Sequence, residues 1–99
     1  MTVLRHVVLI NWTPDASDEQ KQRVAAELGR LPALIPSIRE YRFGSNAGIN
    51  PGGYDFAIVA DFDDAGAYFT YRDNPEHRAI IDAYITPITA QRAAAQYEF

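Results

Sequence analysis

Apolar side chains fall on both faces of the strand that the sequence predicts from Val3 to Trp12. One alternating set contains Val3, Val7 and Leu9, and the other contains Leu4, Val8, Ile10 and Trp12. A strand that is apolar on both faces is normally covered on both faces, whereas a half-exposed strand alternates apolar with polar residues. The segment from Tyr54 to Phe62 shows the same pattern. We therefore predict two central strands, and the fold must cover both faces of each.

The remaining segments carry helix and strand signals in a regular order. Ser17 and Gln20 have the spacing of a capping box, which predicts a helix that runs to about Arg30. Further signals predict a polar edge strand over 38–44, a flexible connection over 45–53, a short helix over 65–72, a helix over 75–85 and a last strand over 92–99. This order predicts a ferredoxin-like α+β domain, βαββαβ, with an antiparallel four-stranded sheet and its helices on one face.

The chain length and the two apolar strand faces together predict a homodimer. The 99 residues suit one domain spanning 1–99. Its helices cover one face of the sheet, which leaves the other face open. Leaving Val3, Val7, Leu9 and Val59 in water would forgo roughly 1.5–3 kcal/mol for each side chain. Face-to-face packing of two sheets removes that cost, so we predict a dimeric α/β barrel.

Composition and charge narrow the classes of partner. The net charge is −4, and the nine basic residues are spread along the chain, which disfavours nucleic acid and anionic membranes as partners. The chain has no cysteine and no apolar run long enough to span a membrane, so we expect a cytoplasmic protein. It also lacks a phosphate-binding loop and any metal-spaced set of His and Cys. We read the acidic cluster of Asp61, Asp63 and Asp64 as a helix cap, and we expect no metal and no cofactor.

The segment from Tyr71 to His77 combines a helix end, a helix start and two candidate chemical groups. Asn74 and Pro75 are typical of an N-cap followed by the first helical residue. His77 then shares one helical face with Ile80, Ile81 and Tyr84, so we expect its ring to point inward. Burial and the positive end of the helix dipole both favour a neutral imidazole, which is a usable general base. The alternative is a hydrogen-bonded core histidine with no chemical role.

His6 belongs to the second alternating set of the first strand, the set that we expect to face the helices. If His77 points down at the sheet, the two histidines of the chain meet in one pocket. His6 would then orient a ligand or a water, and Tyr68, Tyr84 and Ile81 would also bind the ligand. The alternative for His6 is a structural hydrogen bond to a carbonyl or to a tyrosine hydroxyl.

Three motifs resemble the stress-responsive dimeric α/β-barrel (Dabb) family. They are Arg5-His6-Val7-Val8-Leu9, Leu34-Ile35-Pro36-Ser37-Ile38 and the run from Tyr71 to His77. The resemblance covers nearly the whole chain, and it implies the dimeric ferredoxin-like barrel that the patterning also predicts. Some members look like plant stress or defence proteins with no assigned chemistry.

The resemblance also implies a candidate reaction. A plant cyclase of this family closes a polyketide chain by aldol condensation, and its catalytic His and Tyr correspond to His77 and Tyr71. Asn74 stands where that cyclase has a histidine. We expect a pocket for a small hydrophobic or polyketide-like ligand, with cofactor-free cyclase or lyase chemistry. The alternatives are a non-catalytic stress-response barrel and a haem-handling barrel.

Overall fold

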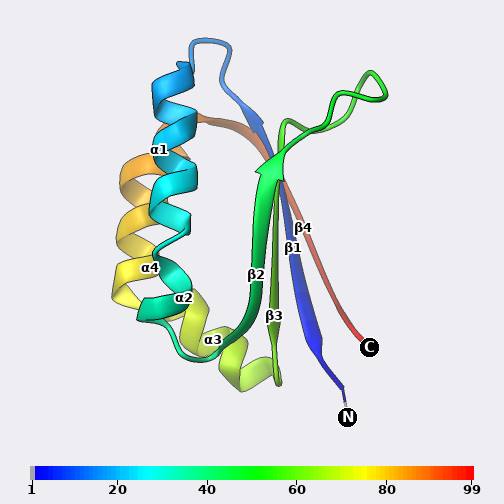
Figure 1. Ribbon diagram of the computed structural model, residues 1–99, viewed down its shortest axis with the longest axis vertical. Helices are drawn as coiled ribbons and strands as arrows, with labels where there is room; N and C mark the ends of the chain where they lie inside the picture. The colour runs from blue at the N-terminus through cyan, green and yellow to red at the C-terminus, as the bar shows by residue number, and fades with distance from the viewer. Residues whose placement is uncertain (1) are drawn as a thin grey trace.

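The computed structural model describes residues 2–99 as one antiparallel sheet with a layer of helices on one side (Figure 1). The strands are β1 (Leu4–Trp12), β2 (Ile38–Ser45), β3 (Phe56–Phe62) and β4 (Thr89–Glu98). The helices are α1 (Asp18–Leu28), α2 (Leu31–Leu34), α3 (Ala65–Asp73) and α4 (Pro75–Ile80), followed by a π-helical turn η1 (Ile81–Ile85) and a 3-10 turn η2 (Thr86–Ile88). None of the helices in residues 2–99 is long and apolar enough to cross a membrane.

The sheet has the strand order β2-β3-β1-β4, so β1 and β3 are central and β2 is an edge strand, as predicted. All three pairings are antiparallel. His6 lies opposite Ala60 and Val7 lies opposite Val59, which fixes the face on which each side chain lies. This is the ferredoxin-like α+β fold, and the prediction of its fold class is confirmed.

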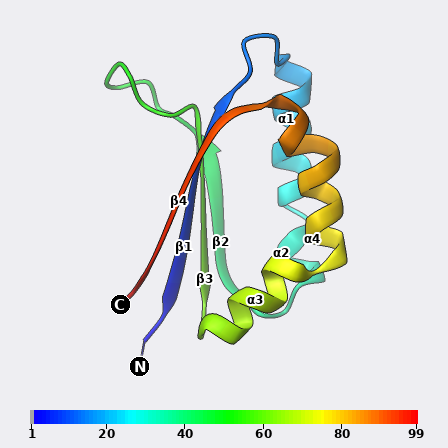
Figure 2. The ribbon, with the colours of Figure 1, turned by 180° about the vertical axis from the view of Figure 1, so that it is seen from behind.

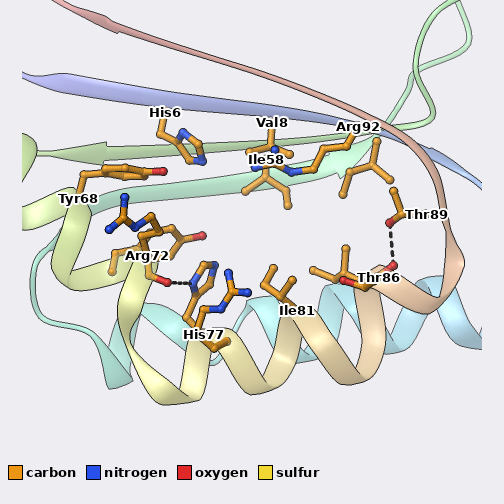
Figure 3. A pocket seen from close by; sticks show the side chains of 14 residues that line it. His6, Val8, Ile58, Tyr68, Arg72, His77, Ile81, Thr86, Thr89 and Arg92 are labelled. Atoms are coloured by element: carbon orange, nitrogen blue, oxygen red, sulfur yellow. Dashed lines mark hydrogen bonds between the residues drawn. The ribbon is translucent and has the colours of Figure 1, made fainter.

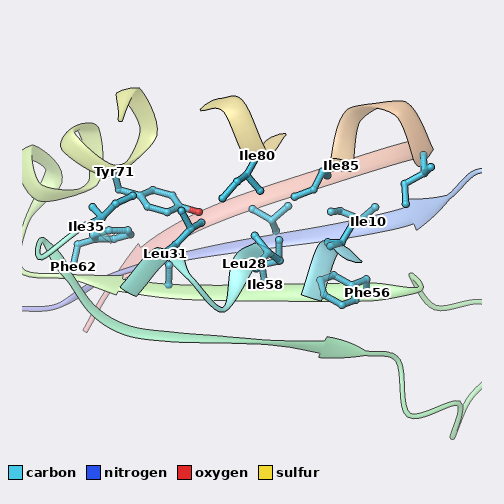
Figure 4. Packing of buried hydrophobic residues seen from close by; sticks show 14 residues of the cluster. Ile10, Leu28, Leu31, Ile35, Phe56, Ile58, Phe62, Tyr71, Ile80 and Ile85 are labelled. Carbon is cyan, nitrogen blue, oxygen red and sulfur yellow. The ribbon is translucent and has the colours of Figure 1, made fainter. Parts of the chain in front are cut away.

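The core lies between the sheet and the helices (Figure 4). Its largest fully buried side chains come from both layers, with Ile10 and Phe62 on the strands and Leu28, Leu31 and Ile35 on or after the helices. Two polar caps fix where helices begin. Ser17 and Gln20 form the predicted capping box, and Asp64 Oδ1 accepts a hydrogen bond of 2.8 Å from the Ala67 amide.

The π-helical turn changes which side chains face inward. A continuous α-helix to Ile85 would place Tyr84 on the same face as His77, but the α-helical part ends at Ile80. A π-helical turn holds more residues than an α-helical turn, so it shifts the phase of every residue that follows. Ile85 is therefore buried, with 5% of its surface exposed, and Tyr84 turns toward α1.

One further helix departs from the sequence prediction. Residues 31–34 form the short helix α2, which is absent from the order of elements predicted above. Pro32 lies in the first turn of α2, where no amide donor is needed, so it does not break the helix.

The second face of the sheet carries apolar side chains that no helix in residues 2–99 covers (Figures 1 and 2). Val7 and Val59 pair at its centre and are half-buried, while Tyr97 and Phe99 are 50% and 55% exposed at its border. Its charged side chains are paired. The Arg5 guanidinium and the Asp61 carboxylate form two hydrogen bonds of 2.8 Å, and Arg42, which lies opposite Val59, donates a hydrogen bond of 3.3 Å to Glu40. This face is therefore a broad, mostly apolar surface.

Candidate functional site

A cavity of about 460 Å³ lies between the helix-facing side of the sheet and the layer formed by α3, α4 and η1 (Figure 3). Its apolar walls are Val8, Ile10 and Ile58 from the sheet and Ile81 and Ile85 from the helices. Its polar lining includes both histidines, two tyrosines and three arginines. Such a mixture, with an apolar body and a few converging polar groups, is typical of a small-molecule site.

His77 is held in place by the local structure that its sequence neighbours create. Pro75 starts α4, and Asn74 Oδ1 accepts hydrogen bonds from the amides of Glu76 and His77 at 2.8 and 3.2 Å. The His77 side chain is buried, and its Nδ1 lies 3.2 Å from the Arg72 carbonyl oxygen. Because a carbonyl oxygen only accepts, Nδ1 carries the proton and Nε2 is left as an acceptor in the neutral ring. Burial lowers the pKa of His77 below its usual 6.5, so the ring is neutral at pH 7.

Tyr71 lies directly against that imidazole. The two ring centroids are 4.0 Å apart, and Tyr71 is 4% exposed. Its hydroxyl is 3.0 Å from the Tyr41 hydroxyl, and burial raises the pKa of Tyr71 to about 12. Burial also raises the pKa of Tyr41. Both phenols therefore keep their protons at neutral pH, and when Tyr41 donates to Tyr71, the Tyr71 proton is left for a ligand.

His6 faces the same cavity from the opposite layer. It is 5% exposed, and its ring centroid lies 4.8 Å from that of Tyr68. The Gln96 side-chain amide donates to His6 Nδ1 at 2.9 Å, so Nε2 carries the proton of the neutral ring. Burial is the main cause that lowers the pKa of His6 to about 4, and the positive charge of Arg92 adds to it.

The two histidines therefore differ in what they can offer a ligand. His77 has an acceptor nitrogen, whereas His6 has a donor nitrogen, and each is fixed by a hydrogen bond on the other side of its ring. Figure 3 shows them on opposite walls of one space, His6 on the sheet and His77 on α4. This arrangement can remove a proton at one point of a ligand and donate a hydrogen bond at another.

The residues expected at the site are divided between this cavity and another surface. His6, Tyr68, Tyr71, His77 and Ile81 all line the cavity. Tyr84 does not, because the π-helical turn directs it toward α1, where its hydroxyl accepts a hydrogen bond of 3.2 Å from Arg23. Its ring centroid lies 5.0 Å from the Arg23 guanidinium carbon. The expected ligand-binding position for Tyr84 was therefore wrong.

Sequence reasoning missed the cavity's arginines and Tyr41. For Arg92 a signal existed, because it alternates with Ala93, and Ala93 pairs with Leu9 on the open face of the sheet. Arg92 must therefore face the helices. Within residues 2–99, no group of three or more His, Cys, Asp or Glu side chains is arranged to hold a metal ion.

The fold and the cavity define a ferredoxin-like α+β protein with a cavity between its sheet and its helices. Residues 4–99 match the family described as the stress responsive A/B barrel domain, known as Dabb. This chain belongs to that family.

Three similar proteins illustrate the range of these relatives. An uncharacterised protein of Streptomyces coelicolor is 35% identical over 80 residues, which cover 78% of this chain and 81% of that protein. A dimeric ferredoxin-like protein of unknown function from Thermobifida fusca is 39% identical, with a TM-score of 0.91, over 99% of this chain and 92% of its own. The hydroxynitrile lyase of Passiflora edulis shares the fold, with a TM-score of 0.86 at 18% identity, over 98% of this chain and 93% of its own.

Proposed function

We propose that this protein binds a small, largely apolar carbonyl compound in the cavity and acts on it by acid–base catalysis, with His77 as the general base. The observation that carries this proposal is the pair of neutral histidines that line one cavity with opposite hydrogen-bonding capacity. The hydroxynitrile lyase with the same fold is compatible with lyase chemistry on this scaffold, although at 18% identity it supports the fold alone.

The proposed reaction begins with a proton transfer to His77. Its Nε2 takes a proton from the carbon next to the ligand carbonyl, and the electron pair of the broken C–H bond moves to the carbonyl oxygen. The Tyr71 hydroxyl and His6 Nε2–H donate hydrogen bonds to the enolate oxygen that forms. Both donors sit in a partly enclosed, low-dielectric site, where such bonds are stronger than in water.

Ring closure or cleavage follows from the same groups. In a cyclisation, the enolate carbon attacks a second carbonyl of the same ligand, a C–C bond forms, and the new alkoxide takes the proton that His77 carries. In a cleavage, these steps run in reverse. Each step moves only protons and electron pairs between the ligand and these side chains, so the proposal needs no cofactor.

We further propose that the functional unit is a homodimer. The open face of the sheet carries Val7, Leu9, Ala57 and Val59, which are half-buried in the single chain. The relative from Thermobifida fusca is described as dimeric, as is a 30% identical one from Bacteroides fragilis. Two such faces packed together would remove this apolar surface from water and close the barrel. A cytoplasmic location is part of the same proposal.

The proposal is tested by hydrogen exchange at a carbon acid. The protein is incubated in D₂O with heptane-2,6-dione, whose hydrogens next to the carbonyls exchange slowly and which cyclises by an intramolecular aldol reaction. We expect the loss of those proton signals by NMR to be about 10²-fold or more faster with protein than without it. Because neutral His77 is the active form and burial lowers its pKa, the exchange rate should fall to half only below pH 6.5. Exchange at the buffer rate for a diketone that measurably binds would contradict the base role of His77.

A further inference from the structure

The polar lining of the cavity has a one-sided charge. Arg72, Arg78 and Arg92 all line it, and no Asp or Glu does, although the chain as a whole has a net charge of −4. A local excess of positive charge in an acidic protein needs a physical reason, because like charges around a small cavity repel one another.

Two of these three guanidinium groups already have acidic partners on the helices. Arg72 forms two hydrogen bonds with the Asp73 carboxylate, at 2.8 and 3.0 Å. Arg78 lies 3.9 Å from Asp82, one helical turn away. Arg92 differs, since among residues 2–99 no carboxylate oxygen lies within 4.0 Å of its guanidinium.

The unpaired guanidinium points at the chemical groups of the site. Arg92 lies opposite Ile10 in the pairing of β1 and β4, which places it on the helix-facing side of the sheet. In Figure 3 its side chain runs along the inner side of the sheet, past Val8 and Ile58, in the direction of His6. Burial is the main cause of the lowered pKa of His6 and His77, and the positive charge of Arg92 adds to it; the same charge partly offsets the rise in the pKa of Tyr71 that burial causes. Arg92 is also exposed to solvent, so it lies at the mouth of the cavity.

We propose that the ligand of this cavity carries a carboxylate, which Arg92 binds at the mouth, while the apolar chain of the ligand extends inward past Ile58 and Ile81. This inference depends on the proposed function in one respect, because the carboxylic acid ligand would also carry the carbonyl group on which His77 acts. A planar guanidinium matches the two oxygens of a carboxylate. One unpaired positive charge suits a monoanion better than a phosphate monoester, whose charge at neutral pH is about −1.5 to −2.

A bound carboxylate would also tune the proposed base. Burial is the main cause that lowers the pKa of His77, and the charge of Arg92 adds a small part, which an anion bound to Arg92 would offset. His77 would then be a slightly stronger base with the keto acid bound than without it. Neutral ketones of the same size would leave Arg92 uncompensated, so the site would select keto acids in binding.

A matched pair of probes tests this inference without requiring catalysis. Octanoate and octanamide have the same chain and differ in the charge of the head group. We expect calorimetric titration of the wild-type protein to show about tenfold tighter binding of octanoate, a modest value for a charge-assisted bond that remains partly hydrated. Arg92→Gln should abolish this difference with little change for octanamide, and Arg92→Lys should keep part of it.

The control removes the same charge elsewhere. The control variant is Arg39→Gln. Arg39 lies on β2, the edge strand at the other side of the sheet from β4, so this substitution should leave the octanoate preference unchanged. Equal wild-type affinities, no binding of either probe, a preference that survives in Arg92→Gln, or tighter binding of octyl phosphate would each overturn the inference. A failure of the diketone exchange would remove the base role of His77 and leave these affinities as they are, so the two proposals fail separately.

Discussion

Replacing His77 by alanine is expected to return the exchange of the diketone hydrogens to nearly the rate in buffer, a loss of about 10²-fold or more. The reason is chemical, because this substitution removes the one buried acceptor nitrogen that a hydrogen bond holds in the basic tautomer. His6 cannot replace it, since its acceptor nitrogen is occupied by the Gln96 amide. The measurement is proton NMR in D₂O at pH 7, with protein concentration matched between variants.

Stability must be separated from chemistry in that experiment. His77→Ala also leaves the Arg72 carbonyl without its partner, which is expected to cost about 1–3 kcal/mol of unfolding free energy. Tyr84→Phe is the control, because Tyr84 lies outside the cavity and loses only its exposed bond to Arg23. We expect normal exchange in Tyr84→Phe. Wild-type exchange in His77→Ala would show that this histidine only binds the carbonyl at the end of α3.

Replacing Val59 by aspartate is expected to convert the dimer into monomers, with at least about a 10³-fold increase in the dissociation constant. Val59 lies at the centre of the open sheet face, opposite Val7. In the dimer, each copy would bury a new carboxylate in that interface. The nearest cation is Arg42, which lies opposite Val59 and is already paired with Glu40. Burying an extra charge costs several kcal/mol. Sedimentation velocity over a range of concentrations measures the change.

The matched control adds the same charge to the helical surface. Gln22 is exposed on α1, on the side of the molecule away from the open sheet face, so Gln22→Asp should leave the dimer intact. A wild-type protein that sediments as a single chain at micromolar concentration would contradict the dimer. It would also mean that Val7 and Val59 stay in contact with water.

Most of the fold could be predicted because its strands have a simple two-residue period. The two apolar sets of β1 and β3 identified the central strands, and the more polar β2 was correctly placed at an edge. The same period placed His6 on the helix-facing side, and the cap at Asn74 fixed the start of the helix that carries His77. Strand periodicity and helix caps depend on residues that are close together in the chain, so they can be recognised from a single sequence.

What the sequence did not predict depends on contacts between distant segments. The π-helical turn that moves Tyr84 out of the cavity leaves no mark in the apolar pattern, because either helix type keeps isoleucines on a buried face. The hydroxyl contact between Tyr41 and Tyr71 joins an edge strand to a helix thirty residues away. Arg92 was assigned to a strand, but its significance appears only once the acidic partners of Arg72 and Arg78 are known.

Two neutral histidines line one cavity, one as an acceptor and one as a donor. Long-range nitrogen–proton NMR correlation spectra of the imidazole rings report the protonation state and the tautomer of each histidine directly. At pH 7 we predict that His77 carries its proton on Nδ1 and His6 on Nε2, as their contacts with the Arg72 carbonyl and the Gln96 amide require. An imidazolium at either position, or the same tautomer in both rings, would contradict this account.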